Sequence, residues 1–66
     1  MKIPDYIKTN RYYVAISKKE ALSSWLTFKD ALDSYKRLSY YQPLDAKKVI
    51  GICQVQQSQK TWILLK

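Results

Sequence analysis

The chain has 66 residues, one cysteine, no histidine and a formal charge of +7 at neutral pH. This length supports one domain, and a domain of about 60 residues buries only about 60% of the surface that its unfolded chain exposes. The single cysteine excludes an intrachain disulfide, and without histidine the chain lacks every usual set of zinc ligands. The fold must therefore rest on apolar side chains, chiefly two tryptophans, six tyrosines and one phenylalanine.

Positive charge is concentrated towards the two ends of the sequence. Residues 1–20 carry five basic side chains against two acids, residues 21–45 carry three of each, and residues 46–66 carry four lysines and no acid. Such a surface attracts polyanions or acidic proteins from a distance. A net charge of this size also keeps a small domain in solution, so the charge alone does not specify a partner.

The sequence predicts no targeting segment. Residues 1–10 contain two lysines and no apolar stretch, and no apolar run approaches the roughly 20 residues of a membrane span. We therefore expect a cytoplasmic protein with no membrane contact.

The first predicted elements are an irregular N-terminal arm and a strand. In the arm, residues 1–10, Pro4 disfavours regular structure in the residue before it. Residues 11–17 (RYYVAIS) are rich in β-branched and aromatic side chains, which predicts a strand. The more apolar face of this strand carries Tyr12, Val14 and Ile16. We expect that face to meet the core, which leaves Tyr13 partly exposed.

Residues 18–28 allow two interpretations. In the first, Ser17 and Glu20 form a capping box and a helix begins at once. In the second, the chain turns, residues 23–27 form a short strand, and Thr27 caps the helix that follows. The two consecutive serines and the Trp-Leu-Thr-Phe sequence favour the second interpretation.

Both interpretations agree on a helix over residues 28–41. Its apolar stripe consists of Phe28, Ala31, Leu32, Tyr35 and Leu38. Pro43 ends this helix, because a proline pushes the preceding residue out of the helical region.

The end of the sequence predicts a hairpin. Residues 47–56 (KKVIGICQVQ) are apolar on both faces between Val49 and Cys53, as in a central strand covered on one side and partly on the other. Gly51 within it indicates a bulge or the close approach of a neighbouring side chain. Residues 57–60 are polar and turn-like, and residues 61–65 (TWILL) form a closing strand.

These elements predict an α+β fold. We expect a small antiparallel sheet of three or four strands, in the order β(β)αββ, with one helix packed on one face. Residues 11–66 form the single compact domain that follows the arm.

The residues that catalysis requires are largely missing. Histidine, the commonest general base, is absent, and a single glycine excludes a glycine-rich phosphate loop. Cys53 lies in the middle of a predicted strand, where a buried and inert thiol is expected. We therefore expect neither enzymatic activity nor a cofactor.

Basic residues next to tyrosines are the first candidate for function. Lysine and arginine neutralise phosphates, and exposed tyrosines stack on unpaired bases for roughly 1–3 kcal/mol each. The chain has no helix-turn-helix, zinc-finger, RNP or KH motif. The pattern predicts a small, non-enzymatic basic module that binds nucleic acid. Its predicted binding residues are Arg11, Tyr13, Lys18, Lys19, Lys36, Arg37, Tyr40, Tyr41, Lys47, Lys48 and Lys60.

The alternative is a protein-binding module. Tyrosine, tryptophan and arginine are common anchors of interfaces, and Tyr40, Tyr41 and Trp62 suit that role. The protein would then be an inhibitor or adaptor, of the kind that phages and mobile elements carry, and would dock on an acidic surface of a larger host protein. The closing strand, if it lies at the edge of the sheet, also permits a homodimer through that edge. For both Trp25 and Trp62, plain core packing is the simpler expectation.

Overall fold

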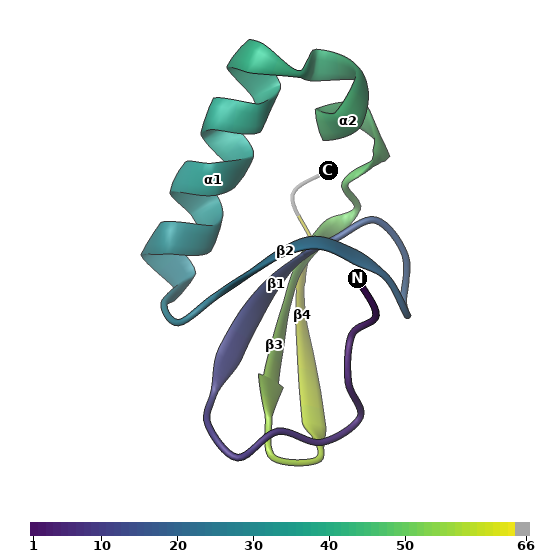
Figure 1. The fold of residues 1–66 in the computed structure, drawn as a ribbon, viewed down its shortest axis with the longest axis vertical. Helices are drawn as coiled ribbons and strands as arrows, with labels where there is room; N and C mark the ends of the chain where they lie inside the picture. Colours follow the sequence, from purple (N-terminus) through teal and green to yellow (C-terminus); the bar gives the residue numbers. More distant parts are fainter. Residues whose placement is uncertain (65–66) are drawn as a thin grey trace.

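The computed structural model describes residues 1–64. Its elements are β1 (Arg11–Ala15), β2 (Ala21–Trp25), α1 (Phe28–Tyr41), α2 (Pro43–Lys48), β3 (Gly51–Gln56) and β4 (Gln59–Leu64), shown in Figure 1. The strands form one antiparallel sheet in the order β2-β1-β3-β4. Helix α1 packs against β1 and β2, and α2 packs against α1. The predicted α+β class and the helix on one face of an antiparallel sheet are confirmed.

The chain between β1 and α1 follows the second interpretation. The Ser17 hydroxyl accepts hydrogen bonds from the backbone N–H groups of Lys19 and Glu20, at 3.2 and 3.0 Å, and closes a turn rather than starting a helix. Strand β2 begins two residues earlier than predicted. Its pairing with β1 contains one irregularity, because Val14 faces Ser23 while Ala15 faces Ala21.

Helix α1 has the predicted bounds and the predicted cap. The Thr27 hydroxyl accepts from the backbone N–H of Asp30 at 3.1 Å and satisfies one of the free donors at the start of the helix. All five residues of the predicted stripe pack in one cluster with Val14 and Ile52. The helix ends before Pro43, as expected.

Pro43 also begins a second helix that the sequence did not predict. Proline is favoured at the first position of a helix, where no N–H is needed. In α2 the carbonyl of Gln42 accepts from the N–H groups of Asp45 and Ala46, both at 3.1 Å. Lys47 and Lys48 therefore lie in a helix, and the prediction that they begin a strand is wrong.

Strand β3 is central, as predicted, and the bulge suggested at Gly51 is absent. Gly51 pairs in register with Ala15 on one side and Leu64 on the other. The hairpin to β4 turns at Gln57, which has the left-handed φ of 55° that such turns often require. Strand β4 lies at the edge of the sheet. Leu65, the last residue of the predicted closing strand, lies outside the described residues.

Both faces of the sheet are covered, which overturns the expectation for Tyr13. Residues 1–10, the N-terminal segment, run along the sheet on the side away from α1 (Figure 1). Its Ile3 is 6% exposed and packs with Tyr13, which is only 5% exposed. The Ile3 N–H donates to the Lys19 carbonyl at 2.8 Å, and the Ile7 N–H donates to the Gln57 carbonyl at 3.2 Å. Tyr13 is buried because this segment covers its face.

The described helices are α1 and α2, and neither combines the length and apolar character needed to cross a membrane.

Candidate nucleic-acid interface

The predicted binding residues lie in three parts of the structure. The helices carry Lys36, Arg37, Tyr40, Tyr41, Lys47 and Lys48. Lys18, Lys19 and Lys60 lie around a pocket that the N-terminal segment forms with the other face of the sheet. Arg11 begins β1, where its guanidinium donates to the Ser24 hydroxyl at 3.2 Å. Tyr13 is in the core, so its ring is not available to a partner.

The largest exposed aromatic surface lies where α1 meets α2. Tyr40 and Tyr41 are 80% and 75% exposed, and the nearby Leu44 is 74% exposed. Tyr40 and Tyr41 lie outside the stripe that ends at Leu38, so the period of the helix directs both away from the sheet. Their rings meet edge to face, with centroids 4.8 Å apart and planes at 78°.

Basic side chains lie on the same two helices as these rings. We call the helix corner the surface formed by Tyr40, Tyr41 and Leu44 together with Lys36, Arg37, Lys47 and Lys48, all of which are exposed. Within it, the Lys48 ammonium lies 3.9 Å from an Asp45 carboxylate oxygen, and the two side chains are 67% and 44% exposed. An ion pair that is largely exposed and this long has only a weak attraction between its charges. The corner therefore presents mainly positive charge.

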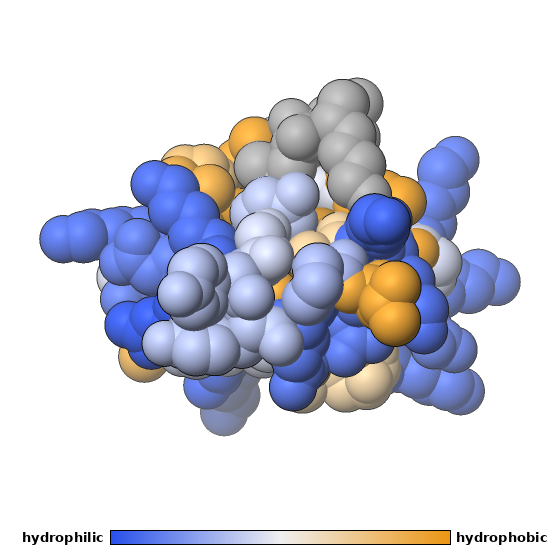
Figure 2. All heavy atoms as spheres, turned by 90° about the horizontal axis from the view of Figure 1, so that it is seen from above, coloured by the Kyte–Doolittle hydropathy of each residue, from blue (hydrophilic) through white to orange (hydrophobic). Residues whose placement is uncertain are grey.

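Figure 2 views this end of the molecule from above. Side chains of intermediate hydropathy gather near its centre, and strongly hydrophilic side chains project around the rim. A hollow of about 210 Å³ between the helices is lined by Tyr35, Ser39, Pro43, Ala46 and Lys47. This is smaller than most ligand pockets, which occupy about 300–1,000 Å³. The hollow between the helices is thus smaller than a typical ligand site.

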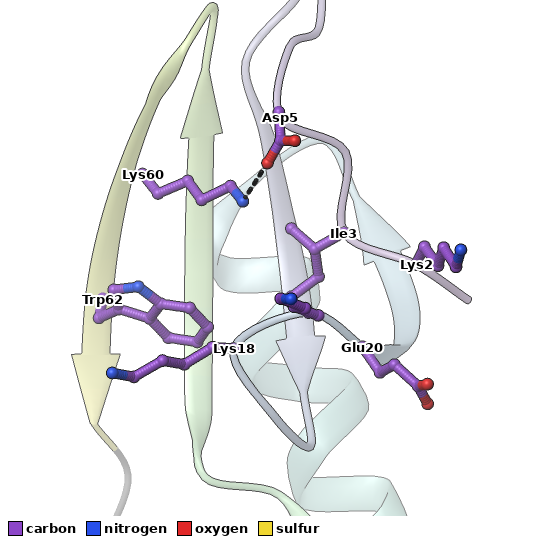
Figure 3. Close-up of a pocket in the computed structure, with 8 residues that line it drawn as sticks. Lys2, Ile3, Asp5, Lys18, Glu20, Lys60 and Trp62 are labelled. Carbon is purple, nitrogen blue, oxygen red and sulfur yellow. Dashed lines mark hydrogen bonds and ion pairs between the residues drawn. The ribbon is translucent and has the colours of Figure 1, made fainter.

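A larger pocket, of about 580 Å³, lies on the other face of the sheet (Figure 3). Trp62 and Lys60 enter it from β4, Ile3 and Asp5 from the N-terminal segment, and Lys18 from the β1–β2 turn. Sequence reasoning did not find this pocket. Its walls come from opposite ends of the chain, and no local pattern indicates that residues 1–10 fold back onto β4.

Two titratable groups near this pocket have altered acidity. The hydrogen bond from Lys60 and its positive charge hold the pKa of the Asp5 carboxyl below its ordinary value. Burial raises the pKa of the Cys53 thiol, and the charge of Lys60 opposes this in part. Cys53 is fully buried, as the sequence predicted, and a thiol in that state is a poor nucleophile.

Within residues 1–64, no three acidic or cysteine side chains come together as a metal site would require. No family model matches the chain, and neither the curated proteins nor the solved structures contain a significant match to it. What the protein binds must therefore be inferred from its own surface.

Proposed function

We propose that the protein is a small, non-enzymatic module that binds single-stranded nucleic acid in the cytoplasm through the helix corner. The observation that carries the proposal is the adjacent pair of exposed rings, Tyr40 and Tyr41. Lys36 and Arg37 lie one turn earlier on the same side of α1. Nucleic acid combines flat bases with a phosphate on every nucleotide, and the corner offers partners for both.

The tyrosines account for the preference for single strands. Unpaired bases stack on exposed aromatic rings whatever their sequence, whereas the bases of a duplex are already stacked on each other. Because Tyr40 and Tyr41 meet edge to face, one base can stack on either ring without separating the pair.

The basic side chains account for attraction to the backbone. Lys36 and Arg37 on α1 and Lys48 on α2 are all exposed, so each can reach a phosphate without first losing buried contacts. Phosphate contacts of this kind release condensed counterions, which makes affinity depend steeply on salt.

The test is binding of a fluorescently labelled single-stranded oligonucleotide at about 50 mM salt, where phosphate contacts are strong. Substituting both Tyr40→Ala and Tyr41→Ala should weaken binding at least about tenfold, given the contribution of stacking per base. The matched control is Tyr6→Ala, since Tyr6 is also exposed but lies in the N-terminal segment. Equal affinity of the corner variant and the Tyr6 variant would refute the proposal.

A second candidate function is protein docking, as an inhibitor or adaptor on a larger protein. Leu44 supports it, because an apolar side chain that is 74% exposed gains more from a protein surface than from phosphates. The unpaired edge of β4 also offers backbone groups to a partner strand or a second copy. Capture from lysate with and without nuclease separates the two functions. A specific partner retained after nuclease treatment, and lost with Leu44→Ser, would favour docking.

A further inference from the structure

The pocket between the N-terminal segment and β4 has an aromatic wall and a basic rim. One side is the indole of Trp62, which packs against the core of this face and is only partly exposed. The buried Ile3 lies across from it (Figure 3). A volume of about 580 Å³ is within the usual range for sites that bind small molecules.

The charged residues of the pocket differ in whether they are paired and in where they point. Lys60 already pairs with Asp5, with the ammonium nitrogen 2.9 Å from a carboxylate oxygen. The carboxylate of Glu20 points away from Trp62, whereas the side chain of Lys18 extends towards it (Figure 3). Lys18 and Lys19 follow each other at the tip of a turn, and both line the pocket.

This turn is held in place by backbone hydrogen bonds. The Glu20 carbonyl accepts from the N–H groups of Ile16 and Ser17, and the Lys19 carbonyl accepts from Ile3. The turn that carries the two lysines is thus joined to the segment that carries the apolar wall. The backbone from which Lys18 and Lys19 extend is therefore fixed relative to the pocket wall at Ile3.

We propose that this pocket binds a nucleotide, with the base against Trp62 and the phosphate between Lys18 and Lys19. A flat aromatic ring joined to a phosphate matches both features, because the indole face favours stacking and the ammonium groups favour phosphate oxygens. An inorganic anion would make no stacking contact with Trp62, and an uncharged aromatic ring would make no ionic contact with Lys18 or Lys19. The site is separate from the helix corner, which lies on the helices at the other face of the sheet.

The experiment is a nuclear magnetic resonance titration of the full chain with adenosine monophosphate. The two tryptophans give separate indole N–H signals, which Trp62→Phe assigns. Trp62 packs in the cluster on the pocket face and Trp25 in the cluster under α1, so Trp25 serves as an internal reference. The Trp62 signal should move and saturate while the Trp25 signal stays in place.

Three variants and two partial ligands complete the test. Lys18→Gln with Lys19→Gln, both on exposed side chains, should weaken binding of the monophosphate at least about fivefold while leaving adenosine unaffected. Trp62→Leu should weaken it at least about fivefold, whereas Trp62→Phe should retain most of the affinity. Adenosine alone and ribose phosphate alone should each bind more weakly than the complete nucleotide.

Two further measurements complete the design. One distinguishes this pocket from the helix corner, and the other distinguishes binding of a free nucleotide from binding of the end of a strand. The Tyr40→Ala, Tyr41→Ala double variant should bind the monophosphate as the unmodified chain does. A short oligonucleotide with a 5′-phosphate should compete for the pocket better than the same strand without it. The proposal is overturned if the Trp62 signal has not moved when the ligand concentration reaches about 10 mM, because that concentration is well above a millimolar dissociation constant. It is equally overturned if adenosine binds as tightly as its monophosphate.

Discussion

The Lys60 ammonium lies 2.9 Å from an Asp5 carboxylate oxygen and joins the edge strand β4 to a residue 55 positions earlier in the chain. The packing of Ile3 holds the N-terminal segment against the sheet. The exposed Asp5–Lys60 pair links the same two parts of the chain. The segment in turn buries Tyr13 and forms one wall of the pocket.

The first prediction concerns the acidity of Asp5. Because Lys60 favours the ionised form, the pKa of Asp5 in the folded protein lies below its ordinary 3.8. The pair therefore adds stability that is fully present above pH 3.8 and is lost as the pH falls through the lower folded value. Lys60→Gln should return the pKa of Asp5 towards 3.8 in a carbon-detected titration, whereas Lys8→Gln should leave it lowered. An unchanged value in the Lys60 variant would contradict the assignment.

The second prediction concerns the contribution of the N-terminal segment to stability. Ile3→Ala removes most of a buried side chain, since Ile3 is only 6% exposed. Substitutions of this kind cost about 2–5 kcal/mol, so urea denaturation should show a loss of about 2 kcal/mol or more. Ile7 is only partly buried, so Ile7→Ala should cost less. A neutral Ile3 variant would mean that the segment does not belong to the core in solution.

The third prediction uses Cys53 to report whether this face is covered. Its thiol is fully buried and its pKa is raised, so reaction with a disulfide reagent near neutral pH should be much slower than in denaturant. Ile3→Ala should speed the reaction, because Cys53 and Ile3 share one cluster. Ala46→Gly, in α2, makes no change on this face and provides the control for general destabilisation. Equally slow labelling of the Ile3 variant and the unmodified chain would argue against the covering role.

The fourth prediction tests the cap of α1. Thr27→Ala removes the hydroxyl that accepts from the Asp30 N–H and should lower the free energy of unfolding by about 1 kcal/mol. Thr27→Ser keeps the acceptor and should restore most of that loss. Thr9→Ala is a matched control, since Thr9 is also exposed but begins no helix. Equal losses from the Ala and Ser variants would show that the hydroxyl is not the cause.

The fifth prediction measures phosphate contacts at the helix corner. Each contact to a single strand contributes a slope of about −0.7 to the dependence of log affinity on log salt. If Lys36 and Arg37 both contact phosphates, replacing both with glutamine should flatten the slope by about 1.4. Lys8→Gln, an exposed change in the N-terminal segment, should leave the slope as it was. If the double variant has the same slope as the unmodified chain, these two residues do not contact phosphates.

Local patterns in the sequence were sufficient to predict α1, its cap at Thr27 and the C-terminal hairpin. Each depends on residues within a few positions of one another: the stripe from Phe28 to Leu38, the hydroxyl three residues before Asp30, and the polar turn before β4. Helix α2 was missed because Pro43 is compatible both with the end of one helix and with the start of the next.

The candidate site also has one part that the sequence predicts and one part that only the fold brings together. The period of α1 predicts that Tyr40 and Tyr41 lie off the apolar stripe, so half of the helix corner follows from sequence alone. The basic residues of α2 join it only because the chain reverses at Gln42. Lys18, Lys19 and Lys60 were predicted as binding residues, but their grouping around Trp62 depends on the folded N-terminal segment.

Sequence patterns alone were enough to predict the class of fold, the main helix, the surplus of positive charge and the shortage of catalytic groups. Tertiary structure alone decided that Tyr13 is buried, where the pocket forms and which lysines surround it. The physical reason is that alternation along a strand tells which side chains share a face. It does not tell which distant segment will cover that face, and here the cover is supplied by Ile3 of the N-terminal segment, with Ile7 packed beside it.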